Sequence, residues 1–65
     1  MNWVSIGAQL PMSGERVLAW AAETFEQDLE VTLARFDGVF FHHGFLSSRE
    51  LRVVTHWMRL PDAPK

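Results

Sequence analysis

The sequence contains no cysteine and no long apolar run, and both absences limit what the protein can be. Without cysteine, no disulfide framework and no thiolate metal site can hold the fold together. No apolar stretch approaches the roughly 18 residues that a membrane-spanning helix needs. The N-terminal segment also lacks the charged start and apolar core of a signal peptide. We therefore expect neither a membrane protein nor a secreted disulfide-rich one.

The patterns that carry enzymatic chemistry are missing as well. The four glycines stand singly along the chain, so no glycine-rich loop is available to cradle a phosphate. None of the serines lies in a G-x-S-x-G elbow. We expect no enzyme, no catalytic residue and no cofactor.

Histidine is the one side chain type that invites a metal interpretation. His42 and His43 are adjacent and would point to opposite faces of a strand, so they are poorly placed to share one ion. His42 and His56 would converge only if the last two predicted strands paired, with Asp37 or Glu50 as a third ligand. Zinc normally takes three or four ligands, and this spacing matches no recognised site. We therefore expect no metal site, and at position 56 a partly buried imidazole hydrogen-bonded to the backbone.

An excess of basic residues is also absent. Six Lys and Arg against eight Asp and Glu give a net charge of -2. Because neutralisation of phosphates supplies most of the affinity of nucleic-acid binders, this balance counts against a nucleic-acid partner. The acidic residues gather in a run with no base inside it, which consists of Glu23, Glu26, Asp28 and Glu30. This run is either a solvated loop or an acidic edge that meets a basic partner.

What the chain does have is 65 residues, 48% of them apolar, which is enough for one small domain over residues 1–65. The distribution of β-branched and aromatic residues predicts strands over 16–21, 31–36, 39–41 and 53–58. Asp37-Gly38 separates two apolar runs and is typical of a hairpin turn, with Gly38 at positive φ. Ser47-Ser48-Arg49-Glu50 has the spacing of a capping box and predicts one helical turn. The expected fold is mainly β, with about four antiparallel strands in a meander and a short helical turn before the last strand.

A small α+β fold is the alternative. From Gly14 to Phe36, apolar residues also recur at helical spacing, which would fit one long helix followed by a hairpin. The strand interpretation accounts for Ser13-Gly14 and Asp37-Gly38 as turns, and we favour it for that reason.

Both ends of the chain carry a recognisable pattern. Near the start stand Trp3-Val4-Ser5, Leu10-Pro11, Gly14 and Val17-Leu18, and the chain closes on Val54-Thr55-His56-Trp57-Met58-Arg59-Leu60-Pro61 with Pro64. The sequence resembles a family of short bacteriophage and prophage proteins that form a domain of unknown function. Arg59 stands where that family commonly has proline. The resemblance implies a phage-type accessory protein in the cytoplasm of a bacterial host, and the family carries no established activity.

The tryptophans of the two end segments have two interpretations. In an extended last strand, Val53, Thr55, Trp57 and Arg59 share one face, while Val54, His56, Met58 and Leu60 share the other. We expect Trp3 to pack near Trp57 or Pro61, because a domain without disulfides needs its aromatic residues for burial. The alternative is that Trp57 and Arg59 are partner contacts, since Trp and Arg are enriched at interface hot spots.

The expected function is protein–protein binding by a phage or prophage accessory protein, with a host factor or host defence protein as the partner. The candidate contact residues are Trp57, Arg59, Glu23, Glu26, Asp28 and Glu30. The alternative is a nucleic-acid-associated protein that uses Phe40, Phe41 and Phe45 beside Arg49 and Arg52 as a stacking platform. We also expect a homodimer, because the strand from Arg16 to Ala22 and the segment Val39–Phe41 would make weakly protected sheet edges.

Overall fold

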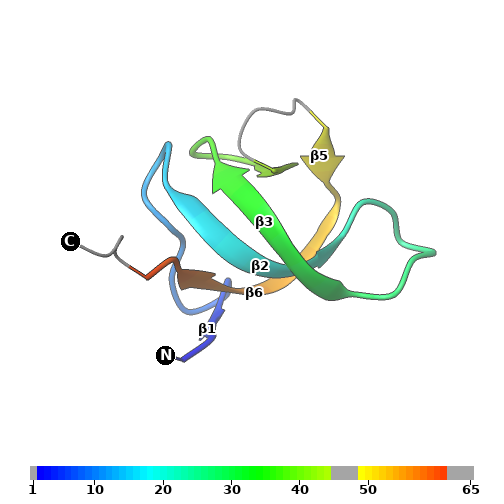
Figure 1. The fold of residues 1–65 in the computed structure, drawn as a ribbon, viewed down its shortest axis with the longest axis horizontal. Coiled ribbons are helices and arrows are strands. Elements are labelled where there is room, and N and C mark those ends of the chain that lie inside the picture. Colours follow the sequence, from blue (N-terminus) through cyan, green and yellow to red (C-terminus); the bar gives the residue numbers. More distant parts are fainter. Residues whose placement is uncertain (1, 45–48, 62–65) are drawn as a thin grey trace.

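The computed structural model describes residues 2–44 and 49–61, and these form one antiparallel sheet of six strands (Figure 1). The strands are β1 (Val4–Ser5), β2 (Arg16–Ala22), β3 (Glu30–Phe36), β4 (Phe41–His43), β5 (Glu50–Leu51) and β6 (Val53–Arg59). No helix occurs within these two ranges. The mainly β prediction is therefore correct.

The β2–β3 hairpin forms the centre of the sheet. In β2, small or branched side chains alternate with large ones, so that Val17, Ala19 and Ala21 are buried while Trp20 is exposed. The pairing places Val17 opposite Ala34 and Ala19 opposite Thr32, so the small residues share the inner face of both strands. This period of two is what a strand with one covered face requires.

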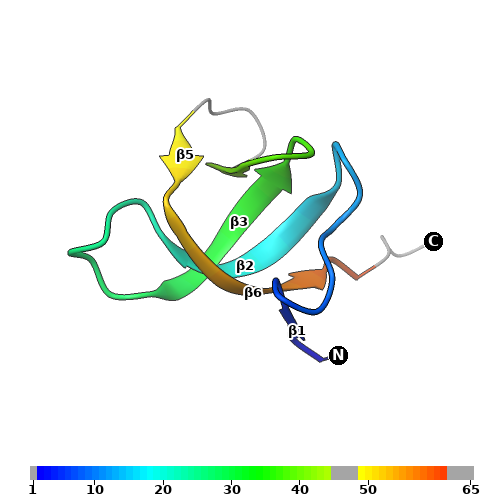
Figure 2. The same cartoon turned by 180° about the vertical axis from the view of Figure 1, so that it is seen from behind.

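The sheet curls because one continuous stretch of chain pairs with strands on both sides of the central hairpin. The strand order is β1-β6-β2-β3-β4-β5. Only Arg52 separates β5, which pairs with β4, from β6, which pairs with β2. The two opposite views follow this stretch as it bends from β5 into β6, which crosses behind the hairpin in Figure 1 and in front of it in Figure 2.

The core fills the inside of this curl. Phe36 and Phe41 lie with ring centroids 4.8 Å apart, and Leu51 and Trp57 belong to the same buried cluster. Burial of these aromatic and aliphatic groups is the main source of stability for so short a chain.

The predicted strands differ from the structure in their bounds, their number and their order. The four predicted strands correspond to β2, β3, β4 and β6, but β4 begins at Phe41 rather than at Val39, and β1 and β5 were missed. The order is not a simple meander, because β6 lies between β1 and β2. Glu50 begins β5, so the predicted helical turn does not extend to it, and Ser47 and Ser48 lie outside the described residues. The long helix over 14–36 is replaced by β2, a loop and β3.

A bulge in β6 changes which of its residues face the core. The pairing with β2 shifts between Trp20, which lies opposite His56, and Ala21, which lies opposite Val54. Thr55 is the extra residue, so Val54 packs against the same core cluster as Trp57. The strict alternation expected along this strand is therefore wrong on the N-terminal side of Thr55.

The two end segments do lie together, but not through the two tryptophan rings. Val4 of β1 pairs with Trp57 of β6, which joins the beginning and the end of the chain. The ring of Trp3 instead contacts Trp20, with centroids 6.5 Å apart in an edge-to-face arrangement. Trp3 precedes Val4 by one residue, so its side chain points to the opposite face of the sheet from the core.

The expected sheet edges are also wrong. β2 lies between β6 and β3, and β4 lies between β3 and β5, so neither is an edge strand. The edges are β1 and β5, which have two residues each. Edges this short offer few unpaired backbone groups to another chain.

Candidate interaction surface on the outer face

The face of the sheet opposite the core carries a contiguous group of exposed apolar side chains. Four of them, which we call the outer patch, keep large exposed fractions: Trp3 40%, Trp20 39%, Val31 55% and Leu33 49%. Single exposed apolar residues are normal on proteins, whereas grouped ones mark interaction sites. The outer patch is therefore the leading candidate for a functional surface.

The strand register brings these side chains together. Trp20 of β2 lies opposite Val31 of β3, and Leu18 lies opposite Leu33. On the other side of β2, Leu18 lies opposite Met58, which is buried. Residues opposite one another in antiparallel strands have Cβ atoms about 4.5–5.5 Å apart. The outer patch is thus a continuous surface that spans β2 and β3.

Trp3 extends the outer patch beyond β6 and encloses a shallow hollow. The hollow has a volume of about 460 Å³ and is lined by Trp3, Trp20, Thr55 and His56. His56 is exposed, and its Nδ1 lies 3.0 Å from the Thr55 hydroxyl oxygen. The expectation of a partly buried imidazole bonded to the backbone is therefore wrong for this residue, which instead forms the polar rim of an apolar hollow.

Three residues of the acidic run lie in the loop between β2 and β3, while Glu30 begins β3, and part of the run lines a second hollow. Residues 23–29 connect β2 to β3, and the Gln27 side-chain oxygen accepts hydrogen bonds from the backbone N–H groups of Glu23 and Thr24. The hollow has a volume of about 420 Å³. Its lining includes Glu23, Asp28 and Glu30 together with His43.

These carboxylates do not form a uniform acidic surface. Glu23 Oε1 lies 3.2 Å from Arg49 Nη2 and 3.9 Å from His43 Nε2, so the Arg49 guanidinium already balances part of its charge. Glu26 borders a different depression, beside Phe25 and Arg52.

The other two candidate contact residues lie elsewhere. Trp57 is only 2% exposed, and its indole N–H donates a hydrogen bond of 2.8 Å to the Gln9 carbonyl. Arg59 ends β6, donates to Glu15 Oε2 at 2.8 Å and holds its guanidinium 5.7 Å from the Trp57 ring centroid. Arg59 lies opposite Val17 near the start of β2, whereas Glu23 follows the end of β2. The six candidates are therefore not one surface.

The sequence carries a signal for the outer patch but does not locate it. The predicted strands have apolar residues on both faces, more than one sheet of this size can cover. Which face stays uncovered depends on how the sheet curls, and that is set by the distant pairing of β6 with β2.

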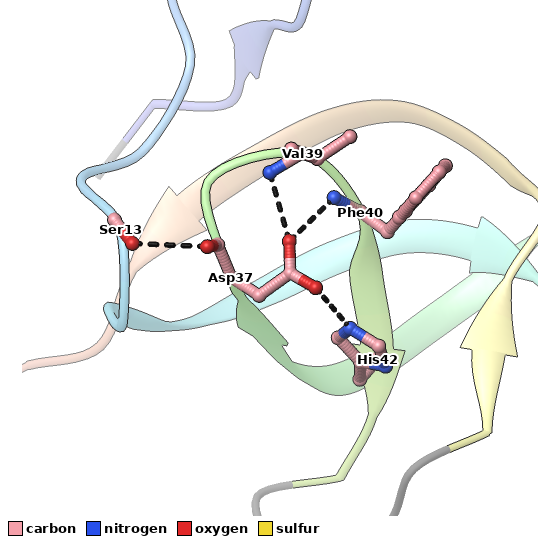
Figure 3. Close-up of polar contacts among 5 residues, drawn as sticks. All are labelled: Ser13, Asp37, Val39, Phe40 and His42. Atoms are coloured by element: carbon pink, nitrogen blue, oxygen red, sulfur yellow. Dashed lines mark hydrogen bonds and ion pairs between the residues drawn. The ribbon is translucent and has the colours of Figure 1, made fainter.

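Asp37 organises the turn between β3 and β4 (Figure 3). Its Oδ1 accepts hydrogen bonds from the backbone N–H groups of Val39 at 2.8 Å and Phe40 at 2.7 Å, and its Oδ2 lies 2.6 Å from His42 Nε2. The Ser13 hydroxyl donates to the Asp37 carbonyl at 3.0 Å and ties the preceding loop to this turn. The hydrogen bond to His42 and the two backbone N–H groups hold the pKa of the Asp37 carboxyl well below its usual range. Gly38 has a φ of 107°, as the sequence predicts.

The histidines do not converge on one another. β2 and β3 separate His42 on β4 from His56 on β6. The two candidate third ligands both lie near His42 rather than His56: Asp37 contacts the His42 ring, and Glu50 of β5 lies opposite His42 of β4 in the strand pairing. No group of three or more potential metal ligands is found in the described part of the chain.

The aromatic platform of the nucleic-acid alternative is divided between two environments. Phe41 is buried in the core, while Phe40 is exposed in the turn. Arg49 contacts Glu23, and Phe45 lies outside the described residues.

Together these features define the class of protein: a small all-β domain with an apolar outer face. The chain belongs to the family described as "Protein of unknown function (DUF551)", whose model matches residues 2–65. No curated protein and no solved structure matches the chain. Within the described residues, no helical segment has the length and apolarity needed to cross a membrane.

Proposed function

We propose that this protein is a non-enzymatic accessory protein of phage or prophage origin that binds another protein through its outer patch. The observation that carries the proposal is the cluster of Trp3, Trp20, Val31 and Leu33, which remain 39–55% exposed on one face. The resemblance of both end segments to short phage and prophage proteins supports the origin, and a bacterial host protein is then the expected partner.

The composition of the outer patch suits protein binding. Two indoles that are each about two-fifths exposed offer on the order of 100 Å² apiece, and with Val31 and Leu33 the patch reaches the size at which apolar surface becomes functional. Tryptophan is enriched among residues that dominate binding energy, and the hollow beside Trp20 offers a place for a partner side chain.

The test compares capture of host proteins by matched variants. We expect Leu33→Glu to abolish capture of a specific host protein by the tagged chain, because a buried, unpaired carboxylate strongly disfavours an apolar interface. Val39→Glu is the control, since Val39 is also apolar and is 73% exposed but lies in the β3–β4 turn outside the outer patch. Equal capture by both variants would contradict the proposed surface, provided that circular dichroism shows both to be folded.

A further inference from the structure

Two arginines border the outer patch at one end of the β2–β3 hairpin. Arg16 and Arg35 lie directly opposite each other, at the end of the hairpin away from its loop, and we call them the arginine pair. Their neighbours Val17 and Ala34 are buried in the core, so the alternation along each strand directs both arginines to the outer face. Arg35 lies two residues from Leu33 on that face, so the arginine pair adjoins the outer patch.

Four of the acidic residues lie away from the outer face of the hairpin. Glu30 begins β3 opposite the buried Ala21, so its side chain lies on the core side of the sheet. Glu23 and Asp28 line the same hollow as Glu30 on that side, and Glu50 lies on the edge strand β5, separated from β3 by β4. The net charge of -2 therefore does not describe the outer face, where the charged side chains of β2 and β3 are both arginines.

The carboxylates that flank the arginine pair in the sequence already have partners. Glu15 Oε2 accepts a hydrogen bond of 2.8 Å from Arg59, and Asp37 Oδ2 lies 2.6 Å from His42 Nε2. Within the described part of the chain, no ion pair to Arg35 is found. Arg35 is therefore available to a carboxylate from another molecule.

The placement of the arginine pair also favours such a carboxylate. Like charges directly opposite each other in antiparallel strands destabilise the pairing. A carboxylate bound between the two guanidinium groups would offset this repulsion. Arginine suits the role because its paired N–H donors match the two oxygens of a carboxylate.

From this charge pattern we infer that the partner of the outer patch is an acidic amphipathic protein segment, whose apolar side chains cover the outer patch and whose carboxylates lie against the arginine pair. The inference rests on the proposed function, because it names the chemistry of the partner at the same surface. The hollow of about 460 Å³ beside Trp3 and Trp20 takes an apolar anchor of the segment. The arginine pair lies four residues further along the hairpin, about 13 Å from the Trp20–Val31 pair.

Other occupants match this surface less well. A nucleic acid presents a phosphate at every nucleotide and is bound by cations that follow its backbone, whereas the arginine pair occupies only one end of an otherwise apolar face. A second copy packed through the same face would bring no carboxylate of β2 or β3 to the arginine pair.

The matched control for the arginine pair is Arg52. Arg35→Glu and Arg52→Glu change the net charge by the same amount. Arg52, however, lies between β5 and β6, beside Glu26 and near the opposite end of β2. A difference between these two variants therefore reports the local charge of the outer face and not the charge of the whole chain.

The first measurement selects ligands from a library of random peptides displayed on yeast, with the full chain as bait. The wild type should enrich peptides that combine Trp, Phe or Leu with Asp or Glu. Arg35→Glu should lose this preference for acidic residues, and Arg52→Glu should keep it. Enriched peptides without an excess of acidic residues, or no enriched peptides at all, would overturn the inference.

The second measurement titrates one enriched peptide by fluorescence anisotropy against variants that circular dichroism shows to be folded. At low salt, Arg35→Glu should bind about tenfold more weakly than the wild type and Arg52→Glu should bind like the wild type. Arg35→Gln, which removes the charge without reversing it, should lie between them, and all differences should shrink at high salt. Equal affinities of Arg35→Glu and Arg52→Glu contradict the inference, as does tighter binding of single-stranded oligothymidylate than of the peptide.

Failure of this inference can be told from failure of the proposed function. Capture of the host protein that is lost in Leu33→Glu but unchanged in Arg35→Glu contradicts the acidic partner and leaves the proposed function standing. Acidic peptides that bind Leu33→Glu as tightly as the wild type, but are lost in Arg35→Glu, support recognition of carboxylates and contradict the outer patch as the binding surface.

Discussion

Replacement of Trp57 by alanine should unfold the protein. Trp57 is 2% exposed and belongs to the central core cluster, so its truncation leaves a large cavity and costs about 3–5 kcal/mol. The Gln9 carbonyl also loses its indole donor, which adds about 1 kcal/mol. A domain of 65 residues has a total stability of about 3–10 kcal/mol, so this loss removes most of it.

The assay is urea unfolding followed by far-ultraviolet circular dichroism, with Trp20→Ala as the matched control. Trp20 is 39% exposed, and its edge-to-face contact with Trp3 is worth about 0.5–1.5 kcal/mol, so its loss should leave the fold intact. We expect the stability of Trp57→Phe to lie between those of Trp57→Ala and Trp20→Ala, since phenylalanine keeps an aromatic ring but has no hydrogen-bond donor. The reasoning is refuted if Trp57→Ala is as stable as Trp20→Ala, or if it folds normally and loses only partner binding.

Two further predictions concern the β3–β4 turn. Ionised Asp37, with its depressed pKa, stabilises the fold above the unfolded-state pKa near 4, and this contribution is lost as the pH falls below about 4. Asp37→Asn should therefore lower the urea midpoint most at higher pH. The difference between the urea midpoints of the wild type and Asp37→Asn should narrow between about pH 5 and pH 2. A gap that is constant across that range would contradict the assigned ionic role. Gly38→Val should cost about 1–2 kcal/mol in urea unfolding, because Gly38 has a φ of 107° and an added Cβ would approach the Ser13 hydroxyl oxygen to 3.2 Å. Gly7→Ala, where the nearest atom is at 3.6 Å, is the control, and equal losses at the two positions would argue against backbone strain.

The sequence predicts β2 and the turn between β3 and β4 well because their signals are local. Alternation of small and large apolar residues marks β2, and Asp37-Gly38 marks the turn, where both the carboxylate cap and the positive φ are found. Strands β1 and β5 have two residues each, too few for any periodicity to appear.

The position of β6 could not be predicted for a different reason. Its pairing with β2 joins residues about 40 positions apart, as in Val17 with Arg59, and no local pattern encodes that choice. The bulge at Thr55 likewise arises only once β6 is fitted against β2. Since the pairing of β6 with β2 decides which face of the sheet is covered, the sequence could indicate a surplus of apolar surface but not its location.

The central claim is that the outer patch is where this protein contacts other proteins, and site-specific photocrosslinking in the host cell tests it most directly. A photoreactive amino acid is placed at Leu33, in the outer patch, and in a separate variant at Val39, which is exposed outside it. The account predicts discrete protein adducts from position 33, either with a second copy of the chain or with a host protein, and none from position 39. Adducts from position 39 alone, or the same faint background from both positions, would contradict it.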